Sequence, residues 1–333
     1  MKISNNPNAI DIDEWSNFVY SHPDGNIFQT PEMYDVFSRT KNYDPVISFS
    51  KNTNLTGILI GVIQREYNFF KSLTSRAIVW GGPLCHNKDE LLAKKILEHY
   101  FDKTKGKILY TQIRNLHDTD SIRSAFTSLD FKFDKHLNYI LDLNKSEDQI
   151  LSEMNKKRRN TIKKSLTFSL TVNEVKDLSG VKSSYKILHS VYKRARLPLA
   201  DYSYFQNAFQ ILKDKGMVTC FNAIYNNQCI GTLWTLNYKD RIYDWYSGSL
   251  SNHLDKYPND FLLWYAIRWS LENKYEIFDF GGAGKPGQKY GVREYKKKFG
   301  GLEVQFGRYE KTHMPIRRNL IFSLYNLYKS FKS

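Results

Sequence analysis

A glycine-rich stretch followed by a cluster of cations carries the clearest chemistry in this sequence. The chain from Phe278 to Glu310 reads FDFGGAGKPGQKYGVREYKKKFGGLEVQFGRYE, an apolar strand that runs into a loop rich in glycine. Glycine lets a backbone approach a ligand closely and adopt positive φ. Lysine beside such a loop suits a phosphate or a reacting acyl group. We therefore expect a ligand-binding loop, with substrate contacts from Gly282, Gly284, Lys285, Gly287 and Lys289.

Two well-known phosphate-binding motifs do not fit this loop. A Walker A loop requires Lys and then Ser or Thr after its last glycine, whereas Gln288 and Lys289 follow Gly287. A dinucleotide fingerprint requires G-x-G-x-x-G between a strand and a helix early in a βαβ unit. Here the glycines lie near the end of the sequence, Pro286 interrupts them, and no long helix is predicted after them. Both motifs are rejected.

The same stretch resembles the C-terminal signature of the Fem aminoacyltransferases (the FemABX family), which attach amino acids from aminoacyl-tRNA to peptidoglycan precursors. In that family a strand leads to an aromatic–Lys pair, with a Phe three residues after the Lys. The matching positions here are Tyr295, Lys296 and Phe299. The resemblance implies that Lys296 is catalytic and that Tyr295 and Phe299 bind substrate.

Other segments resemble the same family. Phe28-Gln29-Thr30-Pro31-Glu32 is similar to its early aromatic–Gln–Ser/Thr segment, and Met154 to Lys164 is similar to the segment that opens its second structural copy. The family places a phosphate-binding Arg after a helix that matches Tyr185 to Arg196, which implies a substrate contact from Arg194 or Arg196. Two Arg at a helix C-terminus could equally serve the helix dipole. The family's Lys after the early segment is replaced here by Phe37.

The elements that must position these residues recur in two halves. In the first half we predict strands at 56–64 and 77–80, a helix at 89–101, and strands at 107–113 and 138–143. In the second half we predict strands at 218–225, 229–238 and 241–246, a helix at 259–272, and a strand at 276–280. This shared order indicates two copies of one α+β unit.

The order matches the acetyltransferase-like (GNAT) fold, which the Fem family carries in duplicate. We expect one GNAT-like unit at 1–145, a second at 146–312 that holds the glycine and Lys signature, and a C-terminal amphipathic helix at 313–333. Each unit should be a mostly antiparallel sheet flanked by helices. Some Fem members insert a long coiled coil in the second unit, but the segment between Leu166 and Gly216 has room only for ordinary helices.

A basic segment opens the second half. Ser146 to Gln149 reads as a capping box, and the helix predicted after it carries six cations in nine residues without an acid. Such a run is usually a solvated helix face, but it is also suited to contact tRNA or another polyphosphate. The candidate nucleic-acid contacts are Lys156, Lys157, Arg158, Arg159, Lys163 and Lys164.

Two aromatic residues on a predicted strand are further substrate candidates. Alternation along the strand would put Tyr243 and Trp245 on one face, where they line a groove or pack in the core. For proton transfer, Asp279 and Glu294 are candidate bases. No Ser-His-Asp or Cys-His arrangement is evident, so covalent catalysis is not expected.

The amino-acid composition indicates what class of protein this is and what kind of partner it binds. The 333 residues carry a net charge of +15 and 15% aromatic residues, which indicates a globular protein with polyanionic partners. The 3 Cys are isolated and the His lack ligand spacing, so we expect no metal site and reduced thiols. Neither a signal peptide nor a transmembrane run is evident, which predicts a cytoplasmic protein.

The C-terminal segment offers one membrane hypothesis. From Pro315 onward the apolar residues fall largely on one helix face, and Arg and Lys supply charge. Such a helix either docks on the second unit or lies on an anionic membrane, at the inner face of the plasma membrane.

The resulting expectation is an aminoacyltransferase that uses aminoacyl-tRNA and a lipid-linked or nucleotide-linked peptidoglycan precursor, with no cofactor. The first alternative is a GNAT-type acyltransferase of cell-envelope or exopolysaccharide biosynthesis that takes acetyl-CoA or another acyl-CoA as donor. The usual acyl-CoA loop pattern, Q/R-x-x-G-x-G/A, has no clear match before Asp89 or Asn259. The second alternative is a non-catalytic RNA- or lipid-binding protein.

Overall fold

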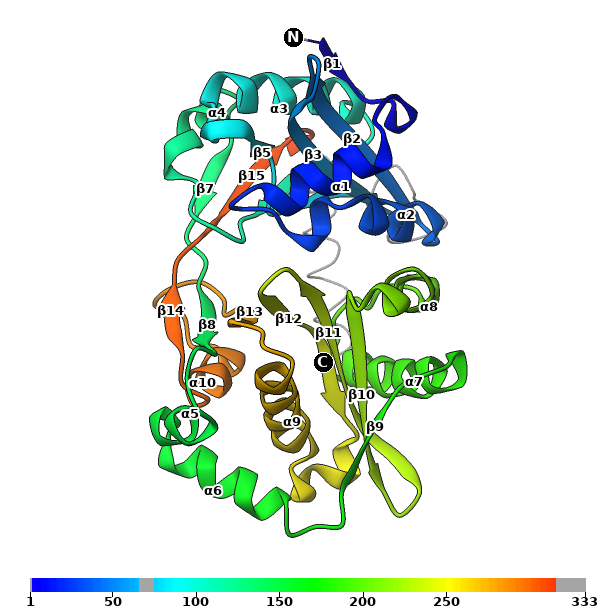
Figure 1. Ribbon diagram of the computed structural model, residues 1–333, viewed down its shortest axis with the longest axis vertical. Helices are drawn as coiled ribbons and strands as arrows, with labels where there is room; N and C mark the ends of the chain where they lie inside the picture. Colours follow the sequence, from blue (N-terminus) through cyan, green and yellow to red (C-terminus); the bar gives the residue numbers. More distant parts are fainter. Residues whose placement is uncertain (1, 66–74, 316–333) are drawn as a thin grey trace. The chain divides into compact units, whose positions relative to one another are not determined.

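The chain forms two compact units in a computed structural model that describes residues 2–65 and 75–315 (Figure 1). Unit 1 comprises residues 1–135 and 306–333, and unit 2 comprises residues 136–305. The amphipathic helix expected near the C-terminus lies, from residue 316 onward, outside the described residues.

Unit 1 is built on one sheet with the strand order β1-β2-β3-β4-β6-β15-β7, and the short β5 pairs with β3. Its strands are β1 (Lys2–Ser4), β2 (Tyr43–Lys51), β3 (Leu55–Gln64), β4 (Arg76–Trp80), β5 (Leu84–Cys85), β6 (Tyr110–Arg114), β7 (Lys132–Asp134) and β15 (Arg308–Thr312). Its helices are α1 (Ile12–Ser21), α2 (Pro31–Arg39), α3 (Glu90–Thr104) and α4 (Arg123–Thr127). Helix α3 buries Leu92, Ile96 and Tyr100 in the core of this unit.

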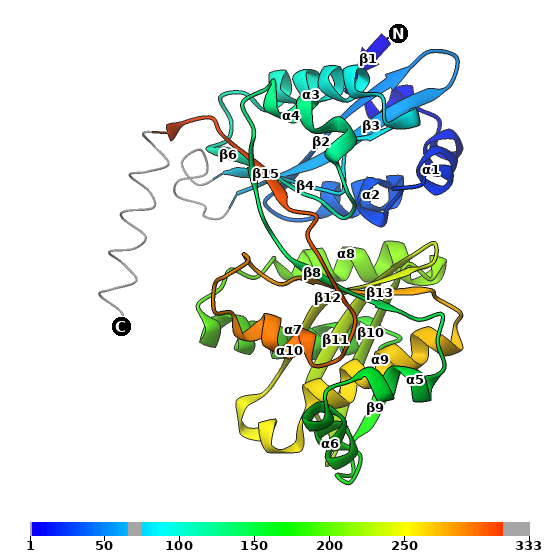
Figure 2. The same ribbon diagram turned by 90° about the vertical axis from the view of Figure 1, so that its left-hand side faces the viewer.

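Unit 2 repeats this plan with the strand order β14-β8-β13-β12-β11-β10-β9 (Figure 1). Figure 2 shows the same elements turned by 90°. Its strands are β8 (Asn138–Asp142), β9 (Thr171–Glu174), β10 (Val218–Tyr225), β11 (Gln228–Tyr238), β12 (Arg241–Ser249), β13 (Ile277–Gly282) and β14 (Leu302–Val304). Its helices are α5 (Glu147–Glu153), α6 (Lys156–Ser165), α7 (Leu178–Ala195), α8 (Tyr202–Leu212), α9 (Pro258–Glu272) and α10 (Gly291–Lys297).

The two units share one order of elements. Each has a strand, a pair of helices, three antiparallel strands, a helix, and a strand parallel to the third, since β4 pairs in parallel with β6 and β12 pairs in parallel with β13. This confirms the expected α+β architecture of two tandem GNAT-like units. The segment between Leu166 and Gly216 holds β9, α7, α8 and a short turn of helix, without a coiled-coil pair, as predicted.

The closing strand of each sheet differs from the expectation. The strand predicted at 138–143 was assigned to the first copy, but β8 pairs with β13 and β14 in unit 2. The sheet of unit 1 is closed instead by β15, which lies between β6 and β7 although it follows unit 2 in sequence. The compact units therefore divide at 135/136 and 305/306, whereas the sequence placed one boundary at 145/146 and left residues 306–312 in the second unit.

Local signals explain where α5 and α6 begin. The predicted capping box at Ser146 and Gln149 is present and starts α5. The helix expected through Lys164 is broken at Met154, and Asn155 caps α6 with its side chain. Among the described residues, every helix is too short or too polar to cross a bilayer.

Candidate functional site

The parallel strands of unit 2 separate at the centre of the sheet. Pairing between β12 and β13 covers only Arg241 to Tyr243 against Ile277 to Asp279, after which both strands continue without pairing to each other. In unit 1, the equivalent strands β4 and β6 pair along their full lengths. A cavity of about 310 Å³ in unit 2 is lined by residues of α7, β11, β12, α9 and α10. A volume of this size accommodates a small substrate group.

Lys296 on α10 lines this cavity. Its ammonium donates to the carbonyl oxygen of Phe280 and, at 2.9 Å, to that of Gly282. Both carbonyl groups lie on β13 beyond its last pair with β12. Lys296 therefore donates to carbonyl oxygens that no longer receive a hydrogen bond from β12. An ammonium has three N–H donors, which leaves one for a ligand. Burial lowers the pKa of Lys296, while the carboxylates of Asp244 and Asp279 oppose that shift.

Asp244 on β12 also lines the cavity, and it was not among the residues predicted from sequence. Burial raises the pKa of its carboxyl to about 6, against the lowering effect of Lys296. The neighbouring Gly281, at φ +70°, would place a Cβ 3.7 Å from the backbone oxygen of Asp244 and 3.9 Å from Lys296 Nζ. The backbone of Asp244 and the ammonium of Lys296 therefore both lie close to Gly281.

The strand geometry explains why Asp244 faces the cavity while its neighbours do not. Tyr243 points to the opposite face and is buried, as alternation along a strand requires. Trp245 has no partner in the β11 register, which shifts between Trp234 and Thr235, so it is a bulge residue. It packs against Tyr204, with ring centroids 5.0 Å apart. Neither Tyr243 nor Trp245 lines the cavity; both belong to the packed interior.

The two carboxylates expected as bases have other positions. Asp279 is 1% exposed, accepts a hydrogen bond from the Gly281 N–H at 2.7 Å, and lies 3.6 Å from Arg241. Burial raises its pKa and Arg241 opposes that shift. Asp279 is therefore held within the sheet and does not line the cavity. Glu294 is exposed on α10 and is not part of the cavity lining.

Tyr295 lines the cavity, whereas Phe299 is fully buried behind α10. Their ring centroids lie 5.3 Å apart. The guanidinium of Arg158 lies over both rings, 4.4 Å from Tyr295 and 4.8 Å from Phe299, and pairs with Asp260 of α9. The aromatic–Lys–Phe signature is thus a helix anchored through its aromatic residues, which presents Lys296 to the cavity.

Of the two Arg expected to contact substrate, only Arg194 lines the cavity. It is exposed in the last turn of α7. Arg196 follows the helix as its C-cap, in a left-handed conformation at φ +54°. Of the two, Arg194 is therefore the one that lies at the cavity, and its contact with substrate stays a prediction.

The glycine-rich loop is organised around Arg293 of α10. Its guanidinium donates to the carbonyl oxygens of Ala283 and Gln288, both at 2.9 Å, and to that of Lys285. Gly284 adopts φ +76°, where a Cβ would meet the Tyr290 ring at 2.9 Å. Gly282 does not line the cavity, but its carbonyl oxygen accepts a hydrogen bond from Lys296. The side chains of Lys285 and Lys289 are exposed, and neither they nor Gly284 and Gly287 line the cavity.

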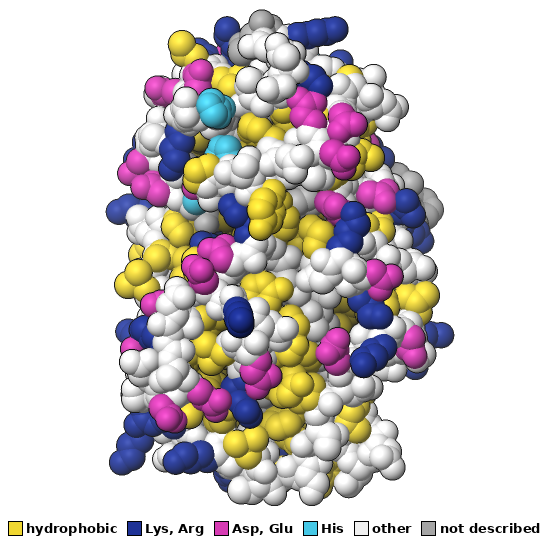
Figure 3. Space-filling view, viewed as in Figure 1, with side chains coloured by type: hydrophobic (Ala, Val, Ile, Leu, Met, Phe, Trp, Pro, Cys, Tyr) yellow, Lys and Arg dark blue, Asp and Glu magenta, His cyan; other side chains and the backbone are white. Residues whose placement is uncertain are grey.

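The basic segment divides into two groups of side chains. Arg158 is 11% exposed, and Arg159 donates to carbonyl oxygens at the end of α5, including that of Ser152 at 2.9 Å. Both therefore make contacts within the fold, Arg158 through a nearly buried side chain and Arg159 through one nitrogen of a part-exposed side chain. Lys156, Lys157, Lys163 and Lys164 are exposed on α6. In Figure 3, Lys and Arg side chains gather at the lower left, over the region of α5 and α6 in Figure 1.

In unit 1, the segment that resembles the early Fem motif has a structural role. Gln29 is fully buried and joins two strands, donating to the carbonyl oxygen of Trp80 at 2.8 Å and accepting from the N–H of Ile60 at 2.7 Å. Phe28 and Phe37 stack on Trp80, with centroids 5.4 and 5.9 Å away. Phe37 is thus a core residue.

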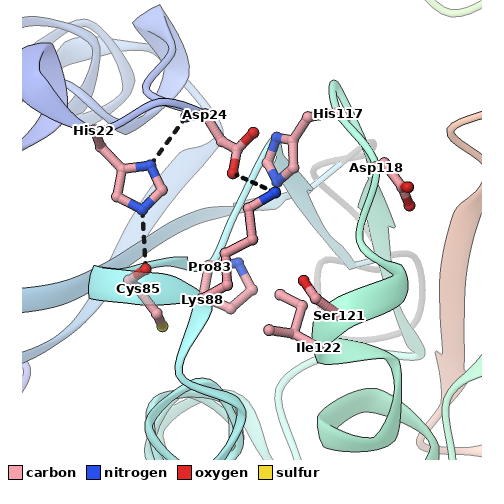
Figure 4. Close-up of a pocket in the computed structure, with 9 residues that line it drawn as sticks. All are labelled: His22, Asp24, Pro83, Cys85, Lys88, His117, Asp118, Ser121 and Ile122. Atoms are coloured by element: carbon pink, nitrogen blue, oxygen red, sulfur yellow. Dashed lines mark hydrogen bonds and ion pairs between the residues drawn. The ribbon is translucent and has the colours of Figure 1, made fainter.

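A second, much smaller cavity lies in unit 1 (Figure 4). Its volume is about 10 Å³, roughly that of one water. His22 lines this cavity. Its ring Nε2 lies 3.0 Å from the carbonyl oxygen of Cys85, and its Nδ1 accepts from the Asp24 N–H at 3.1 Å. The ammonium of Lys88 lies 3.4 Å from the Asp24 carboxylate. This cavity is too small for a substrate.

Comparison with known proteins agrees with this fold. Residues 153–297 match the model of the acetyltransferase (GNAT) domain, a range that contains Arg158, Arg194, Asp244 and Lys296. No curated protein sequence matches the chain significantly.

Among solved structures, FemX is similar at 15% identity with a TM-score of 0.73, covering 96% of this chain and 99% of FemX. L-PGS from Bacillus licheniformis is similar at 14% identity and TM-score 0.60, with 97% and 99% of the two chains covered. A tandem GNAT protein from the clavulanic acid biosynthesis pathway is similar at 8% identity and TM-score 0.63, with 94% and 98% covered. The chain has a FemABX-like duplicated GNAT fold, and residues 153–297 of unit 2 match a GNAT acetyltransferase domain, which supports an acyltransferase.

Proposed function

We propose that the protein transfers an amino acid from aminoacyl-tRNA to an amine of a peptidoglycan precursor, lipid-linked or nucleotide-linked, and that unit 2 performs the chemistry. The observation that carries the proposal is the cavity beside the separated β12 and β13, where the ammonium of Lys296 retains one donor toward the ligand. The similarity in fold to FemX supports the same reaction class.

The proposed step is acyl transfer from an ester to an amine. The amine nitrogen attacks the ester carbonyl carbon, a C–N bond forms, and negative charge develops on the carbonyl oxygen. The C–O bond to the tRNA ribose then breaks, and the proton that the amine gives up goes to the departing ribose oxygen. Lys296 stabilises the developing charge through its remaining N–H. Arg194, exposed at the cavity, is positioned to contact a phosphate of the donor.

The acyl-CoA alternative draws support from the match to the acetyltransferase domain. The start of α9 argues against it. In acyl-CoA enzymes the pyrophosphate sits at a helix N-terminus after a glycine-rich loop. Here that turn begins with Pro258, which has no N–H, and contains the buried carboxylate of Asp260, which Arg158 pairs. This helix start lacks one N–H donor, and its first turn is occupied by an ion pair, so it offers little to a pyrophosphate.

The test is a transfer assay with tRNA charged with a panel of labelled amino acids and with nucleotide-linked and lipid-linked precursors. Lys296→Met should reduce turnover by roughly 10²–10³, the usual loss on removing one donor to a developing oxyanion. Lys297→Met is the matched control, because Lys297 is the next residue on α10 and is exposed. It should retain wild-type turnover.

Two results would contradict the proposal. One is equal turnover of the Lys296→Met variant and the wild type. The other is a wild-type protein that transfers nothing from aminoacyl-tRNA but does transfer an acyl group from acyl-CoA. Mass spectrometry of ligands that co-purify with the protein provides an independent measurement, because bound CoA and bound tRNA are readily distinguished.

A further inference from the structure

Asp244 lacks a partner for its carboxylate. It is the one acidic residue of the cavity lining, as far as the described residues extend. No hydrogen bond or ion pair joins its side chain to another described residue. Its side chain is part-buried and borders the cavity, and its surroundings raise its pKa to about 6. A carboxylate without a protein donor takes its hydrogen bonds from water or from a ligand, and this cavity has room for a ligand that supplies one.

The neighbouring cations do not provide this donor. Lys296 directs two of its N–H groups to Phe280 and Gly282, and Arg241 lies against Asp279. Arg194 lines the cavity without an ion pair to Asp244. The charges around the carboxylate thus shift its pKa, but none of these cations donates a hydrogen bond to its oxygens.

The rest of the lining suits the carbon part of a small group. Val191, Leu233, Leu262 and Leu263 contribute apolar surface to the same cavity. A ligand that fits it combines a compact carbon skeleton with one positive donor near Asp244 and one oxygen near Lys296. An acetyl group has the oxygen but no positive donor.

We propose that Asp244 binds a protonated primary amine of the substrate inside this cavity. The inference rests on the proposed function and specifies it. Two amines have this chemistry, namely the α-ammonium of the aminoacyl group on the donor and the ammonium of the acceptor before it loses its proton. In either case the carboxylate must be ionised to bind.

The first experiment compares Asp244→Asn with wild type, because Asn keeps the shape and removes the charge. Loss of one charge-assisted hydrogen bond should lower kcat/KM about 10- to 100-fold. The matched control is Asp214→Asn, which removes an exposed carboxylate of the same unit and should leave kcat/KM unchanged. Wild-type kcat/KM should also fall as the pH drops through about 6, as Asp244 becomes protonated, and this step should be absent in Asp244→Asn. The other titratable or charged groups around this carboxylate are Lys296, Asp279, Tyr192 and Tyr295, together with Arg194 on the same cavity wall.

A second experiment asks whether Asp244 binds the amine of the donor or that of the acceptor. It uses hydroxyacyl-tRNA, a donor analogue in which a hydroxyl replaces the α-amine. If Asp244 binds the donor, wild type prefers aminoacyl-tRNA over hydroxyacyl-tRNA and Asp244→Asn loses this preference. If Asp244 binds the acceptor, the preference is the same in both proteins and the loss appears as a higher KM for the acceptor.

A binding measurement keeps the inference separate from the proposed reaction. Wild type and Asp244→Asn are titrated by NMR with a panel of amino acid amides, which carry the α-ammonium and a carbonyl but cannot be transferred. Wild type should bind at least one amide about 10- to 100-fold more tightly than the variant. A wild type inactive with every aminoacyl-tRNA contradicts the proposed function. Wild type and Asp244→Asn that are alike in both transfer and amide binding contradict the inference about Asp244.

Discussion

The guanidinium of Arg158 joins three helices of unit 2. Arg158 is a residue of α6, and its guanidinium pairs with Asp260 on α9. The same guanidinium lies over the rings of Tyr295, on α10, and Phe299, two residues after the end of α10. Because α10 is only 7 residues long, it depends on such contacts for its position. Arg158 is therefore a positioning residue for Lys296, although its place in a run of exposed lysines suggested a nucleic-acid contact.

Replacement of Arg158 by Ala should destabilise unit 2 by roughly 3–5 kcal/mol, because it leaves the buried carboxylate of Asp260 without its partner. Urea unfolding measures this change. The control Lys157→Ala changes an exposed neighbour on the same helix and should stay within about 0.5 kcal/mol of wild type. Equal midpoints for the two variants would show that the Arg158 contacts contribute no stability.

The residues of the site differ in how far sequence could predict them. Lys296 and Tyr295 were recognisable because their types and spacing repeat a known signature. Asp244 was not recognisable, because the sequence pattern favoured its aromatic neighbours Tyr243 and Trp245 as the functional residues. Asp244 lies at a cavity because of the bulge at Trp245 and the separation of β12 from β13. A register shift between strands leaves no mark on local sequence pattern.

At the scale of elements, α6 is the helix most suited to contact tRNA. Its exposed lysines 156, 157, 163 and 164 carry no nearby acid within the helix. When binding depends on phosphate contacts, the logarithm of the binding constant falls with the logarithm of the salt concentration, with a slope of about 0.7–0.9 per contact. Changing these four lysines to Gln should reduce the slope for tRNA binding by up to roughly 3 units.

The control for α6 is a set of four exposed lysines at and after α3 in unit 1, namely Lys95, Lys103, Lys105 and Lys107, changed to Gln. Both variants lose the same net charge, so a difference between their slopes reports location and not total charge. Fluorescence anisotropy over a salt series measures the slopes. Identical slopes would mean that α6 is merely a solvated face.

Most elements were predictable because hydrophobic periodicity is local. The expected strands at 56–64, 77–80 and 218–225 correspond to β3, β4 and β10, and the helix at 259–272 corresponds to α9. The turn at Asn226 and Asn227 has positive φ at both residues, as a tight hairpin requires. Strand partners were less predictable, since β8 and β15 resemble any other short strand and their pairing is set by distant residues.

At the scale of the molecule, unit 2 is continuous in sequence and unit 1 is not. The fragment 136–305 contains every strand of the unit 2 sheet. In contrast, a chain that ends at Gln305 lacks β15, so β6 and β7 lose the strand between them and the core loses Tyr309, which stacks on Phe126 at 4.0 Å.

We predict that the fragment 136–305 folds cooperatively on its own. We also predict that the chain truncated after Gln305 keeps the unfolding transition of unit 2 but loses amide protection throughout the sheet of unit 1. Hydrogen exchange with mass spectrometry separates the two units. A chain ending at Pro315, which retains β15, is the control and should protect both. Protection of β6 in the shorter chain would show that β15 is dispensable.

The position of β15 has a consequence for synthesis on the ribosome. When Lys135 has been added, unit 1 has all its strands but one, and β6 presents an open edge. Roughly 180 further residues must be translated before Thr312 exists, which takes on the order of ten to thirty-five seconds at about 5–20 residues per second. During that interval unit 2 can complete its own sheet while unit 1 waits with an unpaired strand, the feature through which nascent chains aggregate. The half of the molecule made first is thus the half finished last.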